Sequence, residues 1–152
     1  MGRGVFRAAG VALLVMVGSV AAWAQAPIVP PVEMEPGVTL EVTELKRMPD
    51  KGAMQLKFVI ANASQKTTSA KDLGLATGFR LDEIQLIDFA GKRAYNIGSA
   101  SRCLCSTFSD GGAVAPGGRR EFWAWFGLPD VGVKTLSLQI SSKPPIGDLP
   151  LQ

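Results

Sequence analysis

Alternation of apolar and polar residues is the feature that most constrains this 152-residue chain. Every second side chain is apolar in residues 38–42 (VTLEV), and residues 53–62 (AMQLKFVIAN) repeat the pattern. Successive side chains of a β-strand point to opposite faces, so a period of two is typical of a half-buried strand. Residues 49–52 (PDKG) supply a turn, because proline presets φ and glycine tolerates a positive φ. The pattern predicts a hairpin, although a longer-range pairing of the two strands has the same signature.

Further short segments of the same kind follow along the chain. Strands are predicted within residues 84–97, with a turn at 90–92, and within residues 119–126 and 134–140. The proline-rich residues 143–152 are expected to form an extended tail along a sheet edge. Short strands separated by glycine and proline turns favour an all-β fold, an immunoglobulin-like antiparallel β-sandwich of about seven strands.

Two segments do not follow a simple strand pattern. The inward parity changes near Asp82 and Glu83, which indicates either a bulge or a delayed strand start. Residues 64–77 show no sustained period, so they predict a long loop with one short helical turn near 70–75.

The start of the chain has the pattern of a secretory signal peptide. Arg3 and Arg7 precede an apolar run, and Ala22 and Ala24 form a small-residue cleavage pattern. That run is shorter than the roughly 20 apolar residues of a transmembrane helix, so we expect cleavage after Ala24 and no membrane anchor afterwards. The expected organisation is a signal peptide at 1–24, an extended Pro-rich linker at 25–36 and an immunoglobulin-like domain at 37–152. The expected location is secreted or periplasmic, in a bacterium.

The charge of the chain belongs mostly to this leader. The full sequence has 16 basic and 13 acidic residues, a formal charge of +3. Removing Arg3 and Arg7 lowers the formal charge to +1, and the short basic clusters that remain are typical of solvated turns. We therefore expect no binding to nucleic acid.

Catalytic signatures are missing from the sequence. It has no histidine, which excludes Ser-His-Asp and Cys-His arrangements and every zinc site that needs histidine. Asp82 and Glu83 are adjacent in a strand region and should point to opposite faces, which suits general acid–base chemistry poorly. The Gly-Gly pairs at 111–112 and 117–118 lack the spacing of a phosphate-binding loop. We expect a protein that is not an enzyme and carries no cofactor.

Both cysteines of the chain lie in residues 102–106 (RCLCS), within a stretch rich in serine and glycine. Residues i and i+2 of an extended strand have Cα atoms ~6.6 Å apart, so a Cys103–Cys105 disulfide requires a bend at Leu104. An oxidising compartment and the lack of another intrachain partner favour that disulfide. The alternatives are copper(I) binding by Cys103 and Cys105, with Met48 or Met54 as a further ligand, reversible thiol–disulfide chemistry, and intermolecular pairing.

Residues 121–126 (EFWAWF) form an apolar strand with two aromatic faces. Alternation places Trp123 and Trp125 on one face and Phe122 and Phe126 on the other. Two interpretations stay open. Either the long loop or the tail covers the tryptophan face, or Trp123 and Trp125 form an exposed patch that binds a partner.

The order of a strand, an Asn-Ala-Ser loop, LDEIQLIDFAGKRAYNI and APGGRREFWAWFGLP resembles the immunoglobulin-like domains of secreted bacterial proteins of unknown function. The RCLCS stretch and the proline-rich ending are similar to a subgroup of exported actinobacterial domains. The resemblance implies a fold and a cell-envelope location, and it implies no catalytic residue. The expected function is an exported, non-catalytic module that binds or supports an envelope protein or cell-wall component. The alternative is a periplasmic copper(I)-handling or thiol–disulfide protein that uses the Cys-Leu-Cys pair.

Overall fold

The computed structural model describes residues 25–99 and 102–152, and the backbone of these residues is all-β. No α-helix occurs in this part of the chain, and all strand pairings are antiparallel. The strands are β1 (Val32–Glu35), β2 (Val38–Met48), β3 (Ala53–Asn62), β4 (Thr68–Ser69), β5 (Ile84–Asp88), β6 (Arg93–Asn96), β7 (Ala113–Val114), β8 (Arg119–Gly127), β9 (Thr135–Ile140) and β10 (Ile146–Pro150). The expected all-β class is confirmed. About seven strands are expected and the described residues contain ten, because β1, β4 and β7, of two to four residues each, are too short to show a period.

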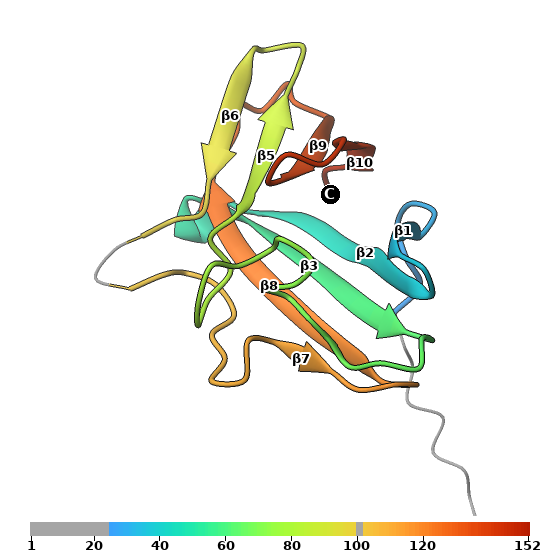
Figure 1. Ribbon diagram of the computed structural model, residues 1–152. Helices are drawn as coiled ribbons and strands as arrows, with labels where there is room; N and C mark the ends of the chain where they lie inside the picture. Colours follow the sequence, from blue (N-terminus) through green and yellow to red (C-terminus); the bar gives the residue numbers. More distant parts are fainter. Residues whose placement is uncertain (1–24, 100–101) are drawn as a thin grey trace, which may run out of the picture.

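The first sheet has the order β1-β2-β3-β8, and its three long strands run side by side in Figure 1. The predicted hairpin is confirmed: β2 pairs with β3 around the 3₁₀ turn Pro49–Lys51, and Gly52 ends that turn with φ of 60°. A register shift between Val42 and Glu44 makes Thr43 a bulge in β2.

The second sheet has the order β10-β9-β5-β6 (Figure 1). β5 and β6 form a hairpin around a turn at 89–92, and β5 begins at Ile84. The delayed start of β5 explains the change of parity at Asp82 and Glu83. The C-terminal segment pairs with β9 as the edge strand β10, so the expected position along a sheet edge is confirmed.

The last two residues connect the two sheets. Leu151 donates its backbone N–H to the carbonyl of Lys134, which directly precedes β9. Gln152 exchanges two backbone hydrogen bonds with β2, donating to Leu45 at 3.0 Å and accepting from Arg47 at 2.7 Å. Residues 151–152 therefore connect the second sheet to the first by backbone hydrogen bonds.

The segment 64–77 contains the helical turn near 70–75 that its sequence predicts, but it also contributes a short strand and core residues. Its strand β4 pairs with β7 in a small third sheet, and Leu73 donates a hydrogen bond to Ser69 across one turn of helical spacing. Ala70, Leu73 and Leu75 are fully buried. The segment closes one side of the core. Its backbone is irregular, so its buried residues follow no regular period in the sequence.

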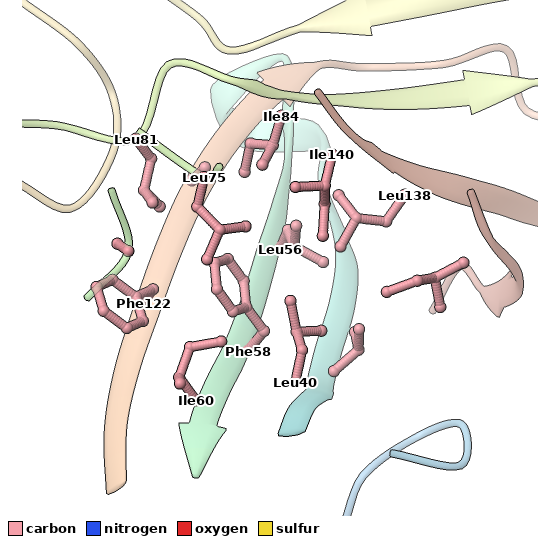
Figure 2. Packing of buried hydrophobic residues seen from close by; sticks show 14 of the residues in the cluster. Leu40, Leu56, Phe58, Ile60, Leu75, Leu81, Ile84, Phe122, Leu138 and Ile140 are labelled. Atoms are coloured by element: carbon pink, nitrogen blue, oxygen red, sulfur yellow. The ribbon is translucent and has the colours of Figure 1, made fainter. Parts of the chain in front are cut away.

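A single hydrophobic core joins the two large sheets. Figure 2 shows side chains of the first sheet converging on side chains of the second. The labelled residues on strands are Leu40, Leu56, Phe58, Ile60 and Phe122 from the first sheet and Ile84, Leu138 and Ile140 from the second. Leu75 and Leu81 close the core from the connecting segments.

The strand order differs from that of an immunoglobulin domain. There the second and third strands lie in opposite sheets, whereas β1, β2 and β3 follow one another as neighbours in one sheet here. The residues 25–36, expected to be an extended linker, include β1, which pairs with β2. The predicted signal peptide, residues 1–24, lies outside the described residues.

Candidate functional site: a tryptophan face and a cysteine pair

Strand β8 places its aromatic residues on two faces, as its alternation predicts. Phe122, Ala124 and Phe126 are buried in the core, and Phe122 stacks on Phe58 with ring centroids 5.5 Å apart. Trp123 and Trp125 point to the outer face of the first sheet, where Lys57 of β3 lies beside Trp123 and Gln55 lies beside Trp125. We call Trp123, Trp125 and these two neighbours the tryptophan face.

Three contacts fix the orientation of Trp125. With the Gln55 amide oriented to satisfy both partners, its oxygen accepts from Trp125 Nε1 at 2.9 Å and its nitrogen donates to Glu44 Oε1 at 3.2 Å. Lys51 Nζ lies 4.7 Å from the centre of the Trp125 ring, a cation–π contact. Trp123 lies against Trp125 with centroids 6.2 Å apart and an angle of 59° between the rings. Trp125 is half-buried as a result.

Trp123 remains the accessible member of the pair, with 36% of its surface exposed. The long loop and the tail, which one interpretation placed over this face, lie elsewhere: Leu73 and Leu75 of the loop are in the core, and the tail pairs with β9 and β2. The ring of Trp123 is therefore exposed to solvent on β8, next to the ring of Trp125, whose orientation is fixed by its contacts.

Charges on the outer face of the first sheet are largely paired. Lys57 forms an ion pair with Glu44 at 3.5 Å, and Arg119 makes two hydrogen bonds to Glu41 at 3.0 and 2.6 Å. The hydrogen bonds to Glu41 raise the pKa of Arg119 above its ordinary value. Both of these cations are therefore engaged by carboxylates, and a further carboxylate, Glu121, is exposed on the same face two residues before Trp123.

The cysteine segment extends the sheet on the other edge of β8. Gly98 N donates to Trp125 O, and Trp125 N donates to Leu104 O, both at 2.8 Å. Ser106 N donates to Trp123 O, also at 2.8 Å, and Ser99 and Cys103 form an isolated bridge. Both predicted site features therefore contact one strand, with the tryptophan rings on its outer face and Cys105 opposite Ala124 on its inner face.

The backbone bends between the cysteines. Their Cα atoms are 5.3 Å apart, less than the ~6.6 Å of an extended strand, and their sulfur atoms lie within bonding distance. Cys105 is buried, with 3% of its surface exposed, whereas Cys103 is half-buried. The Leu81 carbonyl oxygen faces both sulfurs, 3.3 Å from Cys105 Sγ and 3.6 Å from Cys103 Sγ.

Cys103 also lines a cleft of about 710 Å³ at the start of β5 and the ends of β6 and β9. Its walls carry side chains of both charges and three side-chain amides. The charged lining residues are Arg80, Asp82, Glu83 and Arg102, and the amides are Gln85, Asn96 and Gln139. No pattern in the sequence indicates this cleft, because its walls come from three strands and three connecting segments.

Comparison with protein-family models, curated proteins and solved structures found no significant match. No family is therefore identified, and the resemblance to immunoglobulin-like domains rests on its motifs alone. Within the described residues, no three His, Cys, Asp or Glu side chains gather to hold a metal ion. No helix in residues 25–99 or 102–152 is long and apolar enough to cross a membrane.

Proposed function

We propose that this chain is an exported, non-catalytic module that binds an envelope partner through the tryptophan face. The observation that carries the proposal is the exposed Trp123 beside a Trp125 ring held by Gln55 and Lys51. Large aromatic side chains that are already ordered lose little conformational entropy on binding, and they dominate many binding surfaces.

Among envelope partners, the surroundings of Trp123 favour an uncharged cell-wall polymer over a strongly charged one. A polyanion needs an excess of unpaired cations, whereas Lys57 and Arg119 are both engaged by glutamates. A sugar chain presents C–H groups that pack on an aromatic face and hydroxyl groups that hydrogen-bond to polar neighbours, and this face offers both kinds of surface.

The test is co-sedimentation of the purified protein with insoluble cell-wall polysaccharide, with envelope membranes assayed in parallel. Trp123→Ala should weaken binding by about tenfold or more, as expected for an interface anchor. Val131→Ser is the matched control, because Val131 is 87% exposed and lies outside β8. Equal binding by the two variants contradicts the proposal, and loss of binding to membranes alone assigns the face to a protein partner.

Export is the second part of the proposal. It rests on the leader pattern in residues 1–24 and on the cysteine pair, which we propose is a disulfide in the exported protein. The mature chain should begin at Gln25, and both cysteines should resist alkylation until a reductant is added. N-terminal sequencing and intact mass, measured on exported material, check both expectations.

We further propose that the two four-stranded sheets pack as a β-sandwich. The support is the single buried cluster to which both sheets contribute, including Leu56 and Phe58 of β3 and Leu138 of β9. Measured contacts between β3 and β9, from nuclear Overhauser effects between these side chains, test the packing.

A further inference from the structure

The two sulfur atoms of the cysteine pair differ in their access to solvent. Cys103 lines the cleft and is half-buried, whereas Cys105 is 3% exposed, faces Ala124 and does not line the cleft. A reagent that enters the cleft therefore meets the sulfur of Cys103 first. Such an unequal pair is the arrangement that thiol–disulfide exchange requires, with one sulfur to be attacked and one to leave.

The Leu81 carbonyl is placed to stabilise the thiols that form when the bond opens. Its oxygen lies 3.3 Å from Cys105 Sγ and 3.6 Å from Cys103 Sγ, and disulfide sulfurs have no hydrogen to donate to it. A thiol does have that hydrogen. The position of the carbonyl is fixed by a hydrogen bond from Leu81 N to Ser106 O and by the bridge between Arg80 and Thr107.

A bond across one intervening residue contributes little to the stability of the fold. The entropy that a disulfide removes from the unfolded chain grows with the length of the closed loop. Here the loop contains only Cys103, Leu104 and Cys105. Long-range pairing already holds this segment in place through the hydrogen bonds of Leu104 and Ser106 to β8. The bond can therefore open while the fold persists.

Beyond the binding function, we propose that the Cys103–Cys105 disulfide acts as a stoichiometric oxidant, consumed in the step, of a dithiol on an extended segment of another protein chain. A thiolate of the substrate attacks Cys103 Sγ, a mixed disulfide forms, and the electron pair of the broken bond goes to Cys105 Sγ. Cys105 takes up a proton and donates it in a hydrogen bond to Leu81 O. The second substrate thiolate then attacks its own mixed-disulfide sulfur and releases Cys103 as a thiolate, so the substrate loses two electrons and this chain gains them.

The walls of the cleft suit a peptide substrate. Gln85 and Asn96, joined by a hydrogen bond of 2.9 Å, line it together with Gln139, and side-chain amides can pair with a peptide backbone. Arg80 and Arg102 line the same cleft together with Asp82 and Glu83, and Arg80 lies 3.9 Å from Asp82, so the cleft offers paired charges of both signs to the polar side chains of a peptide.

The experiment compares Cys105→Ser, which leaves the accessible sulfur, with Cys103→Ser, which leaves the buried one. Each purified variant is mixed with a synthetic peptide whose single cysteine is activated as a nitrothiobenzoate disulfide, and release of the chromophore is followed at neutral pH. Cys103 should react at least about tenfold faster than Cys105, because its sulfur is accessible. Matching melting temperatures for the two variants show that the difference comes from access and not from unfolding. Equal rates, or a faster Cys105, overturn the proposal.

A second arm uses the oxidised wild-type protein and a two-cysteine peptide, with acid quenching, alkylation and peptide mapping. The expected result is reduction of the pair, with the transient mixed disulfide on Cys103. A pair that stays oxidised in the folded protein but is reduced after unfolding contradicts the proposal. Reduction by a small monothiol as fast as by the peptide contradicts the assignment of a peptide substrate. Trp123→Ala should leave all these rates unchanged, so failure of the binding proposal and failure of this one can be distinguished.

Discussion

Gly112 shows how one residue limits the packing of this fold. Its φ is +73°, and an added Cβ meets the Ala70 Cβ at 2.7 Å and Phe122 Cε1 at 3.1 Å. Gly117 has the same φ of +73° but has open space around the position of a Cβ. An alanine at either position would have the same backbone strain, but only at Gly112 would its Cβ also overlap neighbouring atoms.

Gly112→Ala should destabilise the protein by roughly 1–3 kcal/mol more than Gly117→Ala, because only the first change overpacks the core. Both substitutions carry the cost of a left-handed backbone, which cancels in the comparison. Urea unfolding of the two variants, followed by circular dichroism, measures the difference. Equal losses of stability are incompatible with a close approach of Gly112 to Ala70.

Ionisation of Asp110 makes the stability of the fold depend on pH. Its hydrogen bond from Arg120, 2.7 Å long, holds the pKa of this carboxyl below its ordinary value. A carboxyl whose pKa is lower in the folded than in the unfolded state stabilises the fold above its unfolded pKa. That contribution is lost as the pH falls through the folded pKa.

The melting temperature of Asp110→Asn should lie slightly below that of the wild type at neutral pH, and the difference should vanish in strongly acidic solution. Differential scanning calorimetry from neutral pH to acid measures the two curves. Asp50→Asn, which removes one exposed carboxylate from the turn after β2, controls for the change in net charge. A difference that is constant with pH rules out this role for the Asp110–Arg120 pair.

At the scale of elements, β8 combines a core-forming face and a candidate binding face in nine residues. Phe122→Ala should lower the free energy of unfolding by roughly 3–5 kcal/mol, because its ring packs against Phe58 and Phe108 in the core. Trp123→Ala should cost about 1 kcal/mol or less, because its ring is partly solvated. Chemical denaturation of both variants checks the contrast, and a larger loss for Trp123→Ala is the contrary result.

The sequence predicts β8 and its two faces because strict alternation determines which side chains share a face. It also predicts the β2–β3 hairpin, where Pro49 and Gly52 occupy the turn. The sequence places Leu73 and Leu75 in a long loop with one helical turn and does not show that they are core residues, since no period connects them to a strand. The contact of Leu81 with both sulfurs was equally hidden, because it depends on pairing between residues far apart in sequence.

At the scale of the whole molecule, the cysteine pair should matter little for stability. Replacing both residues, Cys103→Ser with Cys105→Ser, should change the melting temperature only slightly, because the bond closes so short a loop. Thermal unfolding of the double variant beside the wild type measures the effect. A large drop means that the bond holds residues 103–106 against β8, in which case its opening during exchange disrupts the fold.

The pairing of β3 with β8 also sets the order in which the chain can fold. The pairing of β3 with β2 is local, because a short turn joins the two strands. The pairing of the other edge of β3 with β8 can form only after residues 119–127 have been brought to it. Contacts so distant in sequence form slowly, and an open strand edge can pair with another copy of the chain. The yield of refolding from denaturant should therefore fall steeply as protein concentration rises. A separate peptide with the sequence of β8 should compete with the β8 segment of the chain for the unpaired edge of β3.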